Sequence, residues 1–237
     1  MKKVFYKYYS ALFLAALISG FCVASENNVI WKGSDKVPYV ALTFDDGPKP
    51  EFSETILDIL SKEGIKASFF VVGKEAKEHP DIILRMSHEG HEINNHTYSH
   101  LRVSGLSKSK VAEELRLANQ VVYDITGSFP KFFRPPGGSN GPHVSVEVAK
   151  KNMRIANWSV NAGDYVEDSE VFELDEDFDE SAKKLEEKIL AEAHNGAIIL
   201  FHNGSPQTIR SLPRIISGLR ARGLGFTTVS GLLAMEK

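Results

Sequence analysis

Residues 39–229 alternate short apolar segments with longer amphipathic ones, and this alternation limits the fold more than any other feature. The short segments predict strands at residues 39–44, 67–72, 91–95, 132–134, 155–160, 197–202 and 226–229. The longer ones have apolar residues at helical spacing and predict helices at residues 52–62, 81–88, 108–126, 144–151, 180–193 and 209–222. Strands that are joined by helices pair in parallel. The sequence therefore predicts an α/β fold of about seven parallel strands in a single domain, as a barrel or as an open doubly wound sheet.

The start of the chain has the pattern of a secretory signal. Three lysines precede an apolar stretch at residues 11–21 that is short for a membrane span, and small side chains at residues 22 and 24 fit cleavage after Ala24. The prediction is a cleavable signal peptide at residues 1–24 and a secreted or periplasmic protein. The alternative is an uncleaved membrane anchor. Residues 25–37 are then an N-terminal extension, and residues 38–237 are the folded domain.

The charge of the chain argues against one class of partner. The 28 Lys and Arg residues and 31 Asp and Glu residues give a formal net charge of −3. The sequence has no clustered basic stretch of the kind that contacts phosphates, so we expect no nucleic-acid partner. The single cysteine, Cys22, lies in the predicted signal, and we therefore expect no disulfide in the mature chain.

One acidic segment interrupts the alternation of strands and helices. Residues 164–180 contain ten carboxylates and no Lys or Arg. Such a run is usually a solvated loop. The alternatives are a rim that attracts a cationic polymer and a weak calcium site, although the spacing of the acids does not match an EF-hand loop.

Polar and charged residues collect where the predicted strands end. They are Asp45 and Asp46 after the first strand, His96 and His100 after the third, Arg134 after the fourth, Asp164 and Tyr165 after the fifth, and His202 at the end of the sixth. The strands of a parallel barrel end at one mouth, where such folds carry their chemistry. Two histidines four residues apart in one local turn can bind the same ion, to which a neighbouring aspartate adds a carboxylate. This pattern is typical of a metal-dependent hydrolase.

These five segments, in their order and separations, resemble the motifs of the polysaccharide deacetylases of the NodB-homology type, carbohydrate esterase family 4. The resemblance covers most of residues 38–230. It implies a distorted (β/α) barrel with a divalent metal held by Asp46, His96 and His100. One carboxylate and two neutral imidazoles suit Zn²⁺, with Co²⁺ or Ni²⁺ as alternatives, better than Mg²⁺ or Ca²⁺. Three protein ligands also leave one coordination position open for water.

The same resemblance assigns catalytic roles. Asp45 would be the general base that takes a proton from the attacking water, and His202, in a Leu-x-His motif, would be the general acid. Amide cleavage needs this acid because an amine anion is a very poor leaving group, and histidine can donate near neutral pH. Arg134 would hold Asp45 in place and charged. Asp164 would pair with Arg134 or tune His202.

Further residues would contact the substrate. The backbone N–H of Gly137, where the family often has tyrosine, would face the developing oxyanion. Pro135 belongs to the same segment, and its alternative role is to stiffen the loop. Leu200 would line a small pocket for the acetyl methyl group. Tyr165, where the family commonly has tryptophan, would form a wall of that pocket, and Asn161 stands in place of a common aspartate. These differences bear on substrate shape more than on the type of reaction.

The resemblance implies an exported N-deacetylase that removes acetate from N-acetylhexosamine units of peptidoglycan or chitin oligomers. The alternatives are an O-acetyl xylan esterase, a glycan-binding relative with a vestigial site, and an amidase of small cyclic substrates. The presence of the ligands, the base and the acid favours a catalyst, and both histidines of the second segment favour a polymeric or oligomeric substrate. The expected partner is therefore a glycan, and nothing in the sequence indicates an obligate protein partner.

Overall fold

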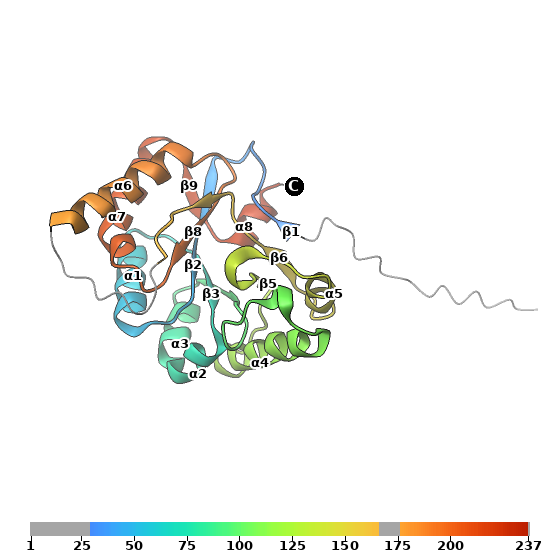
Figure 1. The fold of residues 1–237 in the computed structure, drawn as a ribbon. Coiled ribbons are helices and arrows are strands. Elements are labelled where there is room, and N and C mark those ends of the chain that lie inside the picture. The colour runs from blue at the N-terminus through green and yellow to red at the C-terminus, as the bar shows by residue number, and fades with distance from the viewer. Residues whose placement is uncertain (1–28, 166–175, 237) are drawn as a thin grey trace, which may run out of the picture.

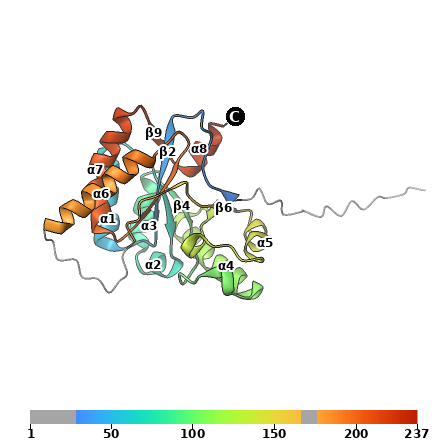
Figure 2. The same cartoon turned by 45° about the horizontal axis from the view of Figure 1, so that its top comes forward.

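The computed structural model describes residues 29–165 and 176–236, which form one sheet enclosed by helices (Figure 1). The predicted signal peptide and residues 166–175 of the acidic segment lie outside the described residues. In the turned view, α1, α6 and α7 lie together on one side of the strands, and α4 and α5 lie on the other (Figure 2). The predicted distorted barrel of parallel strands is confirmed.

The described elements follow one another in a strand–helix alternation. The strands are β1 (Val29–Ile30), β2 (Tyr39–Asp45), β3 (Ser68–Val71), β4 (Glu92–Asn95), β5 (Phe132–Phe133), β6 (Arg154–Ala156), β7 (Val160–Asn161), β8 (Ile198–His202) and β9 (Gly225–Thr227). The α-helices are α1 (Pro50–Lys62), α2 (Gly73–Glu78), α3 (Pro80–His88), α4 (Lys108–Thr126), α5 (Val144–Ala149), α6 (Glu176–Glu192), α7 (Pro206–Ala221) and α8 (Val229–Ala234). Two short 3-10 helices are η2 (Val103–Gly105) and η3 (Pro136–Gly138).

Local signals set the helix ends. Ser107 caps α4 because its hydroxyl accepts from the backbone N–H of Lys110, and Gly127 ends the same helix with φ of 71°. Pro50 and Pro206 occupy the first turns of α1 and α7, where a missing N–H costs no intrahelical hydrogen bond.

The strand order shows how the sheet curls. The hydrogen-bonded order is β1-β6-β5-β4-β3-β2-β8-β7, all parallel, and β9 pairs with the first half of β2. β6 and β7 lie near opposite ends of this order, yet only residues 157–159 separate them in the chain. A connection of that length reaches at most about 14 Å, so the two ends of the sheet must come close together. The backbone crosses the gap directly, because Asn157 N–H donates to Ile30 of β1 and Ser159 N–H donates to Ile198 of β8.

The side chains of β2 divide the core in two. Alternate residues point outward under the helices, where Phe44 stacks between Phe69 and Phe201 with ring centroids 5.3 and 5.6 Å away. The residues between them point into the barrel, since side chains alternate along a strand. In order toward the strand end these inward residues are Ala41, Thr43 and Asp45. The barrel interior is therefore apolar at its floor and polar at its mouth.

Helix α8 closes the floor of the barrel. Val229 and Leu232 are fully buried in the inner apolar cluster. The hydroxyl of Thr228 caps the first turn, and Val229 N–H donates to Ser68 Oγ at the start of β3. The sequence predicted a strand over residues 226–229, and the structure shows that β9 ends early because this cap starts a helix.

Three other features differ from the predicted elements. β1 pairs with β6, so the described part of the predicted extension is hydrogen-bonded to the sheet. The predicted strand at residues 155–160 is divided into β6 and β7, because residues 157–159 cross the gap in the barrel. α2 was not predicted because Gly73–Glu78 has only one apolar side chain, Ala76. No helix in the described ranges has the length and apolar character needed to cross a membrane.

Candidate active site

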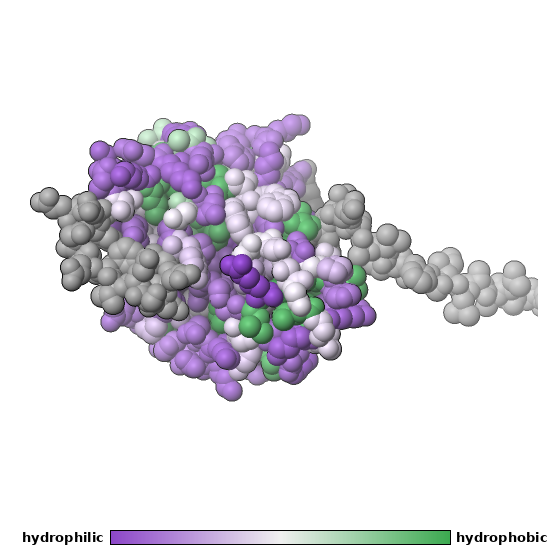
Figure 3. Space-filling view, viewed as in Figure 1, coloured by the Kyte–Doolittle hydropathy of each residue, from purple (hydrophilic) through white to green (hydrophobic). Residues whose placement is uncertain are grey.

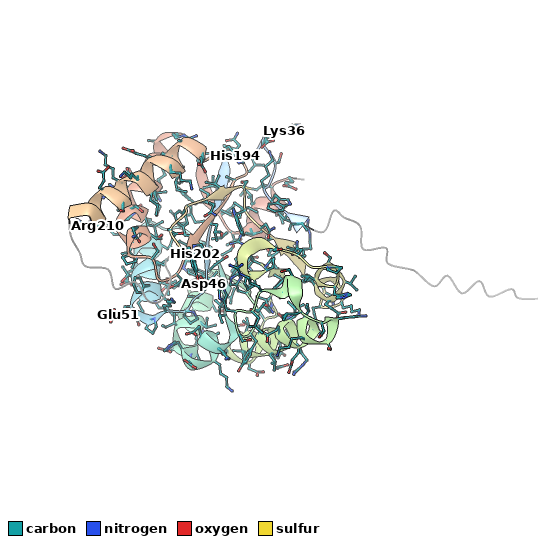
Figure 4. All side chains as sticks on the ribbon, in the orientation of Figure 1. Lys36, Asp46, Glu51, His194, His202 and Arg210 are labelled. Atoms are coloured by element: carbon teal, nitrogen blue, oxygen red, sulfur yellow. The ribbon has the colours of Figure 1, made fainter. Side chains whose placement is uncertain are left out.

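The strand ends surround a cavity of about 460 Å³ at the mouth of the barrel. Its wall includes most of the predicted site residues, namely Asp45, Asp46, His96, His100, Gly137, Tyr165, Leu200 and His202. Figure 4 labels Asp46 and His202 near the centre of the view, whereas Lys36, Glu51 and Arg210 lie toward the periphery. Residues from five separate segments of the sequence thus meet at one opening.

Asp46, His96 and His100 direct one atom each toward a common point. Asp46 Oδ1 lies 3.2 Å from His96 Nε2 and 3.0 Å from His100 Nε2. The three ligand atoms all lie within 4.8 Å of one another. Atoms bound to one tetrahedral zinc ion at 2.0–2.1 Å are roughly 3.3 Å apart. The spacing of these three side chains therefore fits a shared divalent ion.

The second ring nitrogen of His96 fixes its orientation. The Nδ1–H group donates to the backbone carbonyl of Arg134 at 2.8 Å, which leaves Nε2 directed at Asp46. Metal-binding histidines are commonly held in this way, because the hydrogen bond selects the tautomer with a free Nε2. His96 is buried, whereas the side chain of His100 is 40% exposed, so solvent reaches the group from the His100 side.

A buried glutamate of α4 holds the loop between the two histidines. Glu114 is 1% exposed, and its carboxylate accepts from the backbone N–H groups of Tyr98 and Ser99 at 3.1 and 2.9 Å. The Ser99 hydroxyl donates to the same carboxylate. These hydrogen bonds connect residues 97–99, the loop between the two candidate ligand histidines, to α4.

Three site residues adopt a left-handed backbone that is uncommon for residues other than glycine. The φ angles are 74° at Asp46, 67° at Thr97 and 57° at His100. Asn95 stabilises this conformation next to the ligands, because its Oδ1 accepts from Thr97 N–H at 2.8 Å. Such backbone angles are maintained where surrounding contacts over-determine them, as at functional sites.

Electrostatic contacts within the group keep the aspartate charged. Burial acts to raise the pKa of Asp46, but its contacts with His100 and His96 outweigh burial and hold this pKa well below its ordinary value. The contact with Asp46 raises the pKa of His100. Because an imidazole binds a metal only when neutral, a metal ion and a proton compete for this ring.

Arg134 connects the barrel interior to Asp45. Its guanidinium is completely buried and lies 3.9 Å from the centre of the Phe70 ring. The acceptors of its hydrogen bonds are Asp45 Oδ1 at 2.7 Å, Thr43 Oγ1 at 2.8 Å, Ala156 O at 2.8 Å and Asn157 O at 2.9 Å. Burial lowers the pKa of Arg134, and the Asp45 carboxylate acts in the opposite direction. Oδ2 of Asp45 lies 3.9 Å from His96 Nε2, beside the three candidate metal ligands.

The partner of Asp164 is His202 rather than Arg134. His202 Nδ1–H donates to Asp164 Oδ1 at 2.8 Å, and its backbone N–H donates to Oδ2 at 2.9 Å. The buried hydroxyl of Thr208 also donates to Oδ2. Burial acts to lower the pKa of His202, but the hydrogen bond and charge of Asp164, together with the charges of Asp45 and Asp46, outweigh burial and raise it. Nε2 of His202 thus faces the cavity with its proton favoured.

The cavity walls partly match the predicted substrate contacts. Leu200 is 2% exposed at the base of the cavity, and Tyr165 is 56% exposed with its ring edge-on to His202 at 5.1 Å. Gly137 lines the cavity with φ of 70°. Both Pro135 and Pro136 are buried, but Pro135, expected at the substrate site, does not line the cavity, whereas Pro136 does. The reason is the extended backbone at Pro135, which turns successive side chains to opposite sides.

A second cavity of about 400 Å³ continues the first on the other side of the metal-ligand group. Both cavities are lined by Asp46, His100, Tyr165 and His202, and the second extends past Lys49. On the face seen in Figure 3, hydrophobic residues form small separate areas among hydrophilic ones. The reacting groups therefore lie within an elongated polar depression, which suits an extended hydrophilic ligand.

Some residues of the site were not predicted from the sequence. A structural role for Glu114 could have been predicted from the sequence, because this charged residue lies on the apolar face of the predicted helix at residues 108–126 and therefore needs a polar partner. Thr208 and Asn157 act through backbone or carboxylate contacts that leave no pattern in the sequence. Trp158 and Arg102 also line the cavity, and no local pattern of residues predicts either of them at this position.

Comparison with known proteins is consistent with this geometry. A family model described as polysaccharide deacetylase matches residues 32–156. The chain is 32% identical over 202 residues to a peptidoglycan-N-acetylglucosamine deacetylase of Bacillus cereus. The aligned region covers 84% of this chain and 69% of the relative. It is 30% identical over 207 residues to the peptidoglycan-N-acetylmuramic acid deacetylase PdaA of Bacillus subtilis, and the aligned region covers 87% of this chain and 75% of PdaA. A similar enzyme of Listeria monocytogenes, PgdA, is 32% identical, and the chain spans 38% of its length.

Solved structures give the same result. A peptidoglycan N-acetylglucosamine deacetylase superposes with a TM-score of 0.79 at 30% identity, over 87% of this chain and 93% of that one. A pseudoenzyme of carbohydrate esterase family 4 from Bacillus anthracis superposes with a TM-score of 0.77 at 26% identity, over 86% of this chain and 68% of the pseudoenzyme. The chain therefore belongs to the polysaccharide deacetylase family and is a hydrolase of carbon–nitrogen bonds other than peptide bonds.

Proposed function

We propose that the protein is an exported, metal-dependent N-deacetylase that hydrolyses the acetamide of N-acetylhexosamine units in a glycan. The observation that carries this proposal is the position of two proton-transfer groups at the ends of neighbouring strands. The candidate base, Asp45, is paired with Arg134, and the candidate acid, His202, is paired with Asp164. Asp45 ends β2, His202 ends β8, and the two residues are directly opposite in the parallel register. Both line the cavity that contains the three candidate ligands.

Asp46, His96 and His100 would hold the metal. A set of one carboxylate and two imidazoles favours Zn²⁺, with Co²⁺ or Ni²⁺ as alternatives, and the hydrogen bond from His96 Nδ1–H to Arg134 O supplies the usual support. When bound, such an ion lowers the pKa of water and polarises a carbonyl group.

Asp45 would accept the proton of the attacking water. Arg134 binds Oδ1 of this carboxylate and so fixes its plane, while Oδ2 lies on the side of the candidate ligands. Proton transfer requires such fixed geometry, because a base must lie within hydrogen-bond reach of the proton that it removes.

His202 would donate a proton to the departing nitrogen. Its Nδ1–H is bound to Asp164, so Nε2–H is directed into the cavity and its raised pKa favours the protonated ring. The backbone N–H of Gly137 would stabilise the oxyanion, and Leu200 would contact the acetyl methyl group.

The names of the relatives support a glycan as substrate. Deacetylases of peptidoglycan and a chitooligosaccharide deacetylase of Sinorhizobium fredii match this chain. The joined cavities at the barrel mouth have the extent and polarity expected for an oligosaccharide. Export is proposed from the signal pattern of residues 1–24.

The test is acetate release from N-acetylglucosamine oligomers by the wild-type protein and by Asp45→Asn. Asp81→Asn, an exposed change of the same kind on α3, is the matched control. General base catalysis contributes roughly 100- to 10,000-fold, so Asp45→Asn should lose activity by that factor while Asp81→Asn keeps it. Faster release from acetylxylan than from the amide substrates would indicate the O-acetyl esterase instead.

A further inference from the structure

Arg102 is a cation on the wall of the active-site cavity, and none of the described residues supplies a counter-charge to it. The other charged groups of that cavity are paired: Asp45 with Arg134, Asp46 with the two histidines, and His202 with Asp164. Within residues 29–165 and 176–236, Arg102 makes no hydrogen bond, ion pair or ring contact. An unpaired guanidinium at the edge of a binding cavity is a site for an anionic group of the ligand.

The guanidinium lies next to the residue proposed to stabilise the oxyanion. A Cβ atom built on Gly137 would lie 3.9 Å from Arg102 Nε, and apart from residues 136–138 no other described atom comes within 4 Å of it. The position that a side chain of residue 137 would take is therefore open except for Arg102. A substrate group that occupies this position lies within reach of the guanidinium.

The backbone on both sides of Arg102 is fixed. On the N-terminal side, Glu114 binds the N–H groups of Tyr98 and Ser99. On the C-terminal side, Val103 is 1% exposed and packs in an apolar core cluster. The Cα atom of Arg102 is therefore held in place, so binding an anion orders little more than the arginine side chain.

We propose that Arg102 binds a carboxylate on the sugar substrate and that the protein prefers N-acetylhexosamines that carry one. This inference deepens the proposed function and rests on it. Two sources have this chemistry: the lactyl ether of N-acetylmuramic acid and the C6 carboxylate of an N-acetylated uronic acid. A guanidinium recognises either through two parallel hydrogen bonds, and neither an alcohol nor an amide of the same size gives this pairing.

The experiment compares four oligosaccharides of equal length: a neutral N-acetylglucosamine oligomer, one with free lactyl carboxylates, one with the lactyl groups as primary amides, and one of N-acetylated uronic acid units. Acetate release is measured as kcat and KM for the wild-type protein, Arg102→Gln and Arg116→Gln. Arg116 is an exposed arginine of α4, away from the cavity, and loses the same charge. Binding of each sugar is also measured by calorimetry, which does not depend on turnover.

We expect the wild-type protein to favour one of the two carboxylate sugars over the neutral and amidated ones, and the preferred sugar identifies the source. Charge-assisted hydrogen bonds at a partly solvated site correspond to roughly five- to thirty-fold in affinity. Arg102→Gln should raise KM for that sugar by this factor, raise KM for the neutral oligomer by less, and abolish the difference in binding between the carboxylate sugar and its amide. Arg116→Gln should behave as wild type.

Equal effects of Arg102→Gln on neutral and charged sugars, or equal effects of Arg102→Gln and Arg116→Gln, would overturn the proposal. Absence of acetate release from all four sugars would instead contradict the proposed N-deacetylase function. In that case the calorimetric comparison of the carboxylate with its amide still decides whether Arg102 selects a carboxylate.

Discussion

Asp164 holds His202 at two points, since one carboxylate oxygen accepts from the ring Nδ1–H at 2.8 Å and the other accepts from the backbone N–H at 2.9 Å. The two contacts fix both the ring and the strand end that carries it. They also set the tautomer, so that the nitrogen facing the cavity carries the proton available for transfer. A carboxylate that does not itself line the cavity thus determines how the proposed acid works.

Asp164→Asn should move the pH dependence of acetate release. The wild-type carboxylate raises the pKa of His202. The acid works only when protonated, so kcat/KM falls as pH rises through this pKa. The variant removes the raising charge, and the basic limb of the pH profile should therefore shift to lower pH, with a decrease in rate at neutral pH. An unchanged basic limb would show that His202 is not the group that must be protonated.

Loss of Arg134 should destabilise the fold as well as the site. Arg134→Met leaves the Asp45 carboxylate buried without its partner, and breaking a buried pair in this way costs roughly 3–5 kcal/mol in the free energy of unfolding. Denaturant unfolding measures this loss. Arg85→Met, which breaks two surface ion pairs, one with Asp58 and one with Glu89, is the control and should cost at most about 1 kcal/mol for each pair. Adding Asp45→Asn to Arg134→Met should restore part of the stability, whereas simple additivity of the two changes would argue against the pairing.

Helix α4, which supports the loop between His96 and His100, allows a separate test. Glu114→Ala removes the acceptor of the Tyr98 and Ser99 N–H groups and frees the loop that carries both histidines. Contacts behind metal ligands typically contribute 10- to 100-fold in affinity, so we expect zinc to bind about that much more weakly. Glu113→Ala, at the exposed neighbouring position, should leave zinc affinity unchanged. Equal zinc affinities in the two variants would mean that the loop needs no support from α4.

Alanine variants at two glycines with the same backbone conformation distinguish the effect of backbone strain from the effect of a changed cavity shape. Gly138 and Gly127 have φ of 70° and 71°, so alanine is strained at both. Only at Gly138 would the new Cβ meet a side chain, 2.6 Å from Trp158 of the cavity wall, whereas nothing lies within 4 Å at Gly127. We expect both alanine variants to lose stability through backbone strain, and Gly138→Ala to lose more because the Trp158 ring must also move. Gly138→Ala alone should lose kcat/KM, by about tenfold or more, because small displacements near reacting groups are costly.

Much of this arrangement follows from local patterns in the sequence. Apolar periodicity predicted α4 with the bounds that the structure shows, Lys108–Thr126. The structure adds that the Ser107 hydroxyl caps its first turn. The meeting of Asp45 and His202 followed from the general geometry of parallel strands, whose ends share one side of the barrel. These features depend on residues close in sequence or on a rule of topology.

Other features depend on contacts that no local pattern records. The break between β6 and β7 follows from the need to cross the barrel gap, which is set by the whole sheet. The choice of His202 over Arg134 as partner of Asp164 depends on where two loops meet in space. Likewise, which of Pro135 and Pro136 lines the cavity depends on the backbone direction at the end of β5.

The most direct test of the account is metal content measured together with activity. The wild-type protein is stripped with a chelator, reloaded with Zn²⁺, and analysed for bound ion per chain and for acetate release; Asp46→Ala is treated in parallel, with Asp58→Ala as the exposed control. We expect one ion per chain and restored acetate release for the wild type and for Asp58→Ala, and neither for Asp46→Ala. Acetate release that survives complete removal of the ion, or an Asp46→Ala variant as active as wild type, would contradict it.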